Sequence, residues 1–181
     1  MKTLYSANLT LRPVKPIDIS ELSIMLGDPK IARYLFAGKT RSPAQAETYI
    51  NSHFSSEEDD GFGMGTVIET ATEKFAGFAG LIQSSYGDGS DLELGFAIAT
   101  NARGNKYGKE IGMRQIVFGF DDLKCRRLLG LVHPKNDRSH DILKDDLKMK
   151  LIDEIEILDR GPRQVFSLER AAYLETSSYY R

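Results

Sequence analysis

The segment LELGFAIATNARGNKYGKEIG, residues 92–112, is the most informative part of this chain. Its first half is apolar or small apart from Glu93 and predicts a strand. Gly104 and Gly108 then border a short basic loop, and apolar residues recur with helical spacing over 109–123. The recurring residues are Met113, Ile116, Val117, Phe120 and Leu123. A strand, a glycine loop and a helix start in this order are typical of a phosphate-binding site.

Three kinds of phosphate loop have to be compared with this segment. A Walker loop needs one residue more between Gly104 and Gly108, and it needs a hydroxyl where Glu110 stands. The spacing of a Rossmann fingerprint is absent. A short R-G-x-x-x-G loop fits best, because the first free N–H groups of the following helix then point at a pyrophosphate. On the loop alone, a plain turn before a surface helix stays open.

The composition places few limits on function. The chain has 181 residues, 41% of them hydrophobic and 28% charged, with a formal net charge of −2, which is ordinary for one folded domain over 1–181. This balance argues against nucleic acid and membrane partners. The single cysteine, Cys125, allows no intrachain disulfide, and neither a signal peptide nor a membrane-spanning run is recognisable, so we expect a cytoplasmic protein. Four residues that could suggest a metal match no ligand spacing, and no metal is expected. They are His133, Asp137, His140 and Asp141.

The order of predicted elements indicates an α+β fold. Residues 7–14 read as an edge strand. A helix follows with Asp18 and Glu21 as its capping box, and a later helix is capped by Ser42, Pro43 and Gln45. The other elements are a short helix over 28–36, strands over 62–70, 74–83 and 92–99, a helix over 109–123, a strand over 126–133, a helix within 134–147, and strands over 149–159 and 163–173. One strand–helix–strand crossover in a meandering sheet predicts a mixed, mostly antiparallel sheet of six to seven strands flanked by helices.

The segment 92–112 resembles, without a gap, the signature of the GNAT acyl-CoA N-acyltransferases, commonly aEiGyaiapeyrGkGyatEA. The resemblance covers nearly the whole chain, with 9–35 similar to the first strand and helices of the branch that contains the ribosomal-protein N-terminal acetyltransferases. The remaining matches are 61–82, 126–143 and 163–173. The chain is therefore identified as a member of this family. The resemblance implies the GNAT fold, in which the fourth and fifth strands splay apart and open a slot for a thioester.

The resemblance also implies a site for acetyl-CoA or CoA. The strand with Phe96, Ala97 and Ile98 would pair its backbone with the pantetheine arm, and Asn136 would bond to the same arm. Lys109 adds positive charge. The loop that would hold the pyrophosphate comprises Arg103, Gly104, Asn105, Lys106, Tyr107 and Gly108.

Two positions depart from the family pattern. Lys106 replaces the central glycine of the loop, where a side chain either crowds the pyrophosphate or swings out to pair with a phosphate. The helix after Asn136 carries one extra residue, and Lys148 stands where a C-cap glycine is usual. A lysine at positive φ would cost about 1 kcal/mol.

Three residues are candidates for the chemistry of acyl transfer to an amine. Glu93 is the first candidate for the base, since a carboxylate in an apolar strand must be partnered or functional; the alternative is a side chain on an open sheet face. His133 is the second, at the end of the strand beside the slot, unless it is an ordinary loop residue before Pro134. The resemblance places Ser139 near the thiol as the acid, and a plain helix N-cap is its alternative.

We therefore expect an N-acetyltransferase that moves an acetyl group to a protein N-terminus or a small amine by direct attack in a ternary complex. The alternative is a catalytically degenerate module that binds CoA or a protein. A helical lid over 16–57 would shape the acceptor site, and the acidic residues 57–60 would attract a cationic acceptor. The strand over 163–180, with its tyrosine-rich tail, suggests a homodimer interface.

Overall fold

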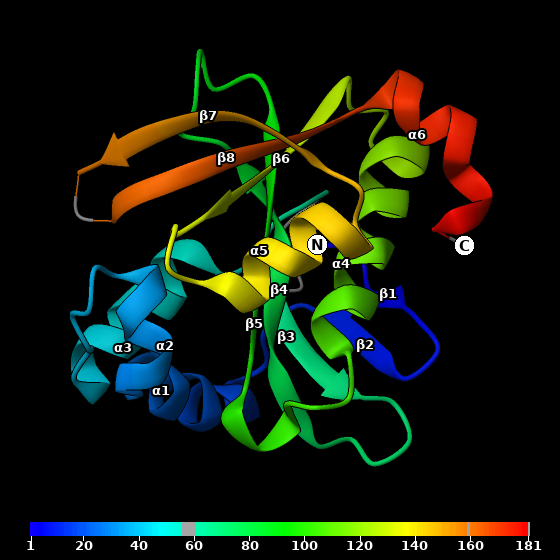
Figure 1. The fold of residues 1–181 in the computed structure, drawn as a ribbon. Coiled ribbons are helices and arrows are strands. Elements are labelled where there is room, and N and C mark those ends of the chain that lie inside the picture. Colours follow the sequence, from blue (N-terminus) through cyan, green and yellow to red (C-terminus); the bar gives the residue numbers. More distant parts are fainter. Residues whose placement is uncertain (56–60, 159, 181) are drawn as a thin grey trace.

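The computed structural model describes residues 1–55, 61–158 and 160–180. It shows one open, mixed sheet of eight strands flanked by helices, in the order β1-β2-β3-β4-β5-β6-β8-β7 (Figure 1). The strands are β1 Leu4–Tyr5, β2 Leu9–Arg12, β3 Met64–Glu69, β4 Phe75–Gln83, β5 Leu92–Ile98, β6 Arg127–Val132, β7 Lys150–Ile157 and β8 Gly161–Glu169. The predicted α+β class with a mostly antiparallel sheet is confirmed.

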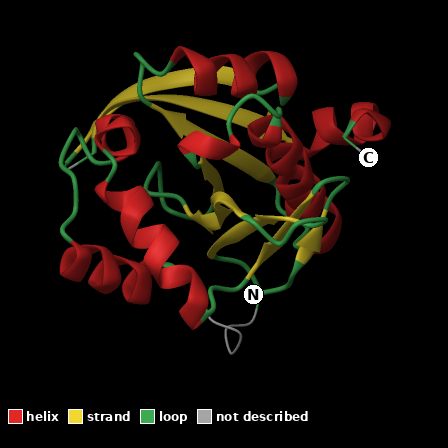
Figure 2. Ribbon diagram, turned by 90° about the horizontal axis from the view of Figure 1, so that it is seen from below, coloured by secondary structure: helices red, strands yellow, loops and turns green. Residues whose placement is uncertain are grey.

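The helices fall between the strands as the sequence predicts. The helices are α1 Ile19–Gly27, α2 Pro29–Leu35, α3 Pro43–His53, α4 Tyr107–Val117, α5 Asp137–Asp141 and α6 Arg170–Thr176, with wider turns at Phe118–Asp122 and Ile142–Asp146. In Figure 1, α1, α2 and α3 gather at the lower left, and α4 and α6 lie on the right. Figure 2 shows helices around the strands on several sides. No helix in the described ranges is both long and apolar enough to cross a membrane.

The sheet has one strand more than expected. Leu4–Tyr5 pairs antiparallel with β2, so the strand predicted at the edge lies one place inside it. Glu110 of α4 holds the turn between β1 and β2 in place. Its carboxylate accepts hydrogen bonds from Ser6 Oγ at 2.7 Å and from the Asn8 N–H at 2.7 Å. The pattern around residues 1–6 is too short to predict a strand by itself.

The sheet is forked at its only parallel pair in the described part of the chain. β5 and β6 share two register pairs, Leu92 with Leu128 and Glu93 with Leu129. β5 continues to Ile98, paired with β4 along its whole length, while β6 turns to pair with β8. The backbone of β5 beyond Glu93 therefore leaves the side facing β6 open, as the predicted splay of these strands requires.

Helix capping agrees with the sequence at α3 and differs at α1. Ser42 and Gln45 form the predicted capping box of α3, with Gln45 N–H to Ser42 Oγ at 3.3 Å. The box predicted for Asp18 and Glu21 is wrong. Asp18 is buried and accepts hydrogen bonds from Arg12 at 2.7 Å and from Thr66 Oγ1 at 3.0 Å. A buried carboxylate gains more from pairing with a cation than from capping a helix, so its side chain does not cap α1.

The end of the chain also differs from the prediction. The last strand stops at Glu169, and the segment that follows is helical, so there is no exposed strand over 163–180. β8 lies between β6 and β7 and is largely buried. Tyr173 and Tyr180 pack into the core rather than facing outward, because α6 turns them back over Phe120 and Leu147. The predicted homodimer surface therefore does not have the expected form.

Candidate functional site

A cleft of about 480 Å³ opens where β5 and β6 separate. Its floor is the outer half of β5, one wall is the start of α4 with the preceding loop, and the other is the start of α5. Side chains of α2, among them Lys30 and Tyr34, close it from the fourth side. The predicted residues that line it are Phe96, Ala97, Ile98, Arg103, Gly104, Lys106, Tyr107, Gly108, Asn136 and Ser139.

The cleft needs a glycine at position 108. A Cβ atom built there would lie 3.0 Å from Ile142 Cδ1 and 3.1 Å from Phe96 Cε2, so a side chain would have to push both neighbours aside. The first turn of α4 therefore approaches β5 and the helix after α5 by its backbone. Its N–H groups have no helical acceptor, and an anion in the cleft is the partner that the helix dipole favours.

Both family departures adopt the backbone that a glycine would have. Lys106, the N-cap of α4, has φ 60° and ψ 18°, and Lys148 has φ 54°. The prediction that position 148 lies at positive φ is confirmed. Each lysine keeps the turn at a cost of about 1 kcal/mol relative to glycine. The extra residue of this segment coincides with the wider π-turn over Ile142–Asp146, which holds one more residue than an α-turn.

Two predicted loop residues lie away from the cleft. Lys109 Nζ pairs with Asp146 Oδ1 at 3.0 Å, and Asn105 donates to the carbonyl of Ala102 at 3.3 Å; neither lines the cleft. Arg103 does line it, with Nε bonded to the carbonyl of Ile98 at 3.2 Å. The basic rim instead gains Lys30, Lys135 and Arg138, which the loop pattern does not predict because they come from α2 and from the turn into α5.

The start of α5 offers two polar groups to the cleft. Asn136 Oδ1 accepts from the N–H of Ser139 at 3.4 Å and so caps α5, which leaves the amide nitrogen of Asn136 to donate. Ser139 Oγ has no hydrogen-bond partner within the described residues, and the residue lines the cleft. Ser139 is therefore not the N-cap of its helix, and its hydroxyl is available to a ligand.

Glu93 lies at the apex of the fork, at the last register pair of β5 with β6. Its side chain does not line the cleft. It is 3% exposed and pairs with Arg160 of the β7–β8 turn, with Arg160 Nη2 at 3.1 Å from Glu93 Oε1. Glu93 Oε2 is buried without a hydrogen-bond partner. The alternative of a carboxylate on an open sheet face is thereby excluded, and one buried carboxylate oxygen is left without a hydrogen bond.

His133 lies beside α2, with its ring centre 5.6 Å from that of Tyr34, and it does not line the cleft. Its Nδ1 accepts from the N–H of Lys135 at 3.1 Å. Burial, together with the charges of Arg163 and Lys135, lowers the pKa of His133. A neutral ring that accepts at Nδ1 carries its proton on Nε2, so His133 is arranged to donate rather than to act as a base.

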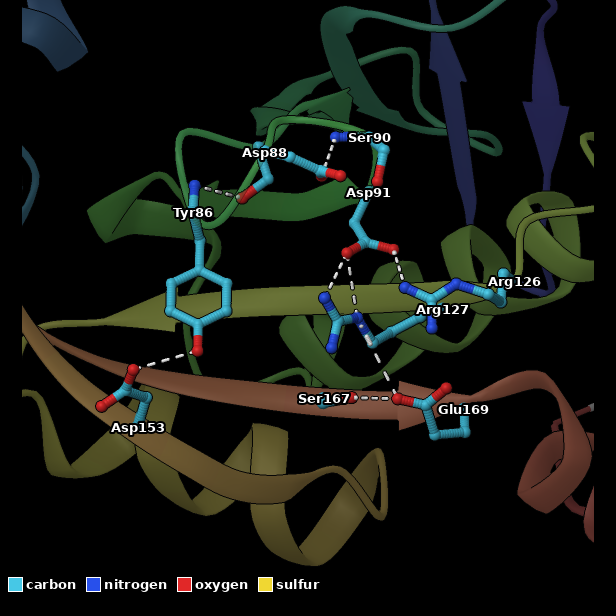
Figure 3. A network of polar contacts seen from close by, with 10 residues as sticks. Tyr86, Asp88, Ser90, Asp91, Arg126, Arg127, Asp153, Ser167 and Glu169 are labelled. Carbon is cyan, nitrogen blue, oxygen red and sulfur yellow. Dashed lines mark hydrogen bonds and ion pairs between the residues drawn. The ribbon is translucent and has the colours of Figure 1, made fainter.

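The closed end of the fork is held by ion pairs (Figure 3). Asp91, just before β5, pairs with Arg126 at 3.4 Å and with Arg127 of β6. Arg127 also lies 4.0 Å from Glu169 of β8, and Tyr86 of the β4–β5 loop donates to Asp153 of β7 at 2.9 Å. These contacts join β5, β6, β7 and β8 at the closed end of the fork. The position from which β5 and β6 separate is therefore fixed. The acidic residues 57–60, predicted to attract an acceptor, lie outside the described residues.

The comparisons with known proteins agree with this geometry. The family model of the acetyltransferase (GNAT) domain matches residues 8–145. The chain belongs to the GNAT acetyltransferase family. The chain is also 25% identical over 143 residues to the uncharacterized N-acetyltransferase p20 of Bacillus licheniformis, which covers 79% of this chain and 80% of that protein.

Solved structures confirm the fold. A GNAT-family acetyltransferase from Bacillus anthracis superposes with a TM-score of 0.78 at 13% identity, covering 94% of this chain and 99% of that one. Spermidine N-acetyltransferase from Vibrio cholerae, in complex with CoA and spermine, gives a TM-score of 0.75 at 17% identity, covering 93% and 99%.

Proposed function

We propose that this protein transfers an acetyl group from acetyl-CoA to the primary amine of a small molecule, by direct attack of the amine within a ternary complex. The observation that carries the proposal is the forked sheet, with an open β5 backbone and the N-terminus of α4 on the same cleft. Membership of the GNAT family and an N-acetyltransferase among the relatives support it. The Vibrio cholerae neighbour that binds spermine supports a small amine over a protein N-terminus.

The cleft fits CoA in three respects. The open backbone of β5 can pair with the amide groups of a pantetheine arm, as a neighbouring strand would. The first turn of α4 offers N–H groups to a pyrophosphate, and Gly108 lets this turn pack closely against Phe96 and Ile142 of the cleft. The rim carries Arg103, Lys106 and Arg138, which suit the remaining phosphate charge. When bound, acetyl-CoA supplies a thioester carbon that a free amine can attack.

The chain's own groups then handle protons and position. Glu93 Oε2, buried and without a partner, accepts the proton that the amine must lose. Arg160 donates a hydrogen bond to Oε1 and so holds the carboxyl group in place. Ser139 Oγ, on the cleft wall, donates a hydrogen bond to the departing thiolate, which leaves as the anion or takes its proton from solvent. The chain itself need not form a covalent bond with the acyl group, so the lack of a nucleophile is no obstacle, and placing both substrates at the fork supplies much of the acceleration.

The test is a titration followed by an activity screen. Isothermal titration with acetyl-CoA, CoA and ATP should show micromolar binding of the first two and much weaker binding of ATP. Release of the CoA thiol is then measured with a panel of amines and peptides. Thiol release that depends on a small amine supports the proposal. No acetyl-CoA binding at millimolar concentration contradicts it. Binding without thiol release from any acceptor would favour the alternative of a degenerate CoA-binding module, which Lys106 and Lys148 suggest.

A further inference from the structure

Three arginines surround Glu93 on the side of α2 and α3, away from the cleft lining. Arg41 precedes α3, Arg160 lies in the β7–β8 turn, and Arg163 begins the buried part of β8. We call these residues the arginine cluster. In Figure 1 the end of β7 and the start of β8 lie on the same side of the molecule as α2 and α3, and a Cβ atom built on Gly161 would lie 3.9 Å from Ala37 Cβ. Segments far apart in sequence therefore meet over the apex of the fork.

Arg163 has a structural role in this cluster. It is 1% exposed, and its guanidinium donates to the carbonyls of Pro162 at 2.7 Å, Tyr34 at 2.9 Å and Leu35 at 3.3 Å. These bonds fasten the C-terminal end of α2 to β8, where a cation also complements the helix dipole. Its donors are largely used within the protein.

Arg160 and Arg41 have donors to spare. The side chain of Arg160 makes one hydrogen bond in the described residues, to Glu93, and is 31% exposed. Arg41 has no carboxylate partner there, and its Nε is buried without a hydrogen bond. The Arg41 guanidinium carbon lies 4.1 Å from the ring centre of Phe36 and 4.2 Å from that of Tyr49, and these two rings meet edge to face. Two cation–π contacts hold the guanidinium in place, and a guanidinium held in this way is prepared to bind a carboxylate.

The charged side chains around Glu93 and the arginine cluster are mainly positive. The pKa of Tyr49 is raised by burial and responds to Arg41, Arg160 and Glu93, which puts all three around one phenol. The electrostatic neighbours of His133 and Arg163 add Arg33 and Lys135, against the single further carboxylate Glu156. In the described ranges, cationic side chains thus outnumber carboxylates around Glu93, where the amine is proposed to lose its proton. A polyamine would be repelled there, whereas an anionic group would be attracted.

On the basis of the proposed function, we infer that the acceptor is an amine that carries a carboxylate near the amino group, as an amino acid does. Arg160, supported by Arg41, holds the carboxylate, and the amine faces the unpartnered Oε2 of Glu93. Because Arg160 touches Glu93 directly, the carboxylate and the amine of the acceptor must be only a few bonds apart. The transfer itself is unchanged: a C–N bond forms, the C–S bond breaks, and the proton of the amine passes to Glu93.

The experiment compares acceptors that differ only in the carboxylate. Thiol release from acetyl-CoA is measured with an amino acid, its carboxamide and the corresponding amine without the carboxyl carbon, for several side chains, with spermidine and a short peptide as further acceptors. The kcat/KM values are expressed per free amine, since the three compounds differ in amine pKa. We expect the amino acid to be preferred at least about tenfold, because the donors of Arg160 are left unpaired by the other two.

Variants of the cluster identify the group that reads the carboxylate. Arg160→Gln should lower kcat/KM for the amino acid at least about tenfold more than for the decarboxylated amine, and Arg160→Lys should restore part of the preference. Arg41→Gln should reduce the preference by a smaller factor. Lys74→Gln, at the exposed β3–β4 turn, removes one positive charge elsewhere and should leave the preference unchanged.

The outcomes separate this inference from the proposed function. A preference for the amino acid that disappears in Arg160→Gln supports the inference, and the wild-type panel alone decides it if a variant does not fold. Turnover in which the decarboxylated amine or spermidine is equal or better overturns the inference and leaves the proposed function standing. A peptide that is the better acceptor overturns both the inference and the choice of a small molecule as acceptor. Absence of thiol release from every acceptor overturns the proposed function, and with it the inference.

Discussion

The cleft between β5 and β6 and the arginine cluster adjoin the apex of one fork, but they use different parts of the chain. The cleft presents backbone: the open edge of β5, the N–H groups of α4 and the close approach that Gly108 permits. The arginine cluster presents side chains, of which Arg160 and Arg41 lie beside the carboxylate of Glu93. A site made of backbone tolerates changes of side chain at its rim, whereas a site made of side chains does not. The effects of substitution should therefore differ sharply between the two.

The largest effect is expected from Glu93→Gln, beside the arginine cluster. Removal of the base should lower kcat by about a hundredfold or more, because proton removal by a placed carboxylate contributes at least that much. The acetyl-CoA Kd should stay within about threefold, since Glu93 does not line the cleft. Glu156→Gln, an exposed carboxylate near the same arginines, is the matched control and should retain activity. A Glu93→Gln variant with nearly normal kcat would mean that the carboxylate is only structural.

An intermediate effect is expected from Gly108→Ala in the cleft. Alanine in a helix usually makes a protein about 1 kcal/mol more stable than glycine does. Here, however, the new methyl group would lie 3.0 Å from Ile142 Cδ1 and 3.1 Å from Phe96 Cε2, which is closer than normal van der Waals contact. We expect a net loss of about 1–3 kcal/mol in the free energy of unfolding and about a tenfold weaker acetyl-CoA Kd. Urea unfolding and calorimetric titration measure the two quantities. A variant more stable than the parent would show that the packing at α4 is looser than described.

A smaller effect is expected from Lys106→Gly at the rim of the same cleft. Glycine adopts the left-handed backbone without strain, so unfolding should cost up to about 1 kcal/mol more. The acetyl-CoA Kd should change by no more than about threefold, because an exposed charge is screened by salt. Lys148→Gly is the matched control, with the same backbone geometry outside the cleft lining. A gain in affinity of tenfold or more in Lys106→Gly alone would instead support the interpretation of a decayed cofactor site.

The same contrast explains what could be predicted from the sequence. A backbone site leaves its record in adjacent residues, because Gly104 and Gly108 mark the turn and the close approach within one short segment. The order of strands and helices was predictable for the same reason, since hydrophobic periodicity is local. Glu93 could be singled out, because an acid in an apolar strand is unusual. Its partner Arg160 lies 67 residues further along the chain, in a turn with no pattern of its own.

The errors also follow from long-range contacts. Asp18 has the spacing of a helix cap, but Arg12 and Thr66 bind it instead, and Thr66 comes from another strand. Lys109 has the right charge for a phosphate loop, but Asp146 pairs with it from the helix after α5. In both cases a nearby opposite charge or buried donor, brought by the fold, outweighs the local preference.

The smallest expected effect concerns pH and belongs to the side-chain region. Burial and neighbouring cations lower the pKa of His133 in the folded protein. In the unfolded chain the ring titrates near its ordinary value of about 6.5, so on acidification the unfolded state takes up a proton that the folded state resists. The stability contributed by neutral His133 is therefore present above that pH and is lost as the pH falls below it. Urea unfolding at pH 7.5 and 5.5 should show a steeper loss of stability for the parent protein than for His133→Gln. Equal losses would mean that His133 is as free to protonate in the fold as in the unfolded chain, and the accepting role of Nδ1 would then have to be abandoned.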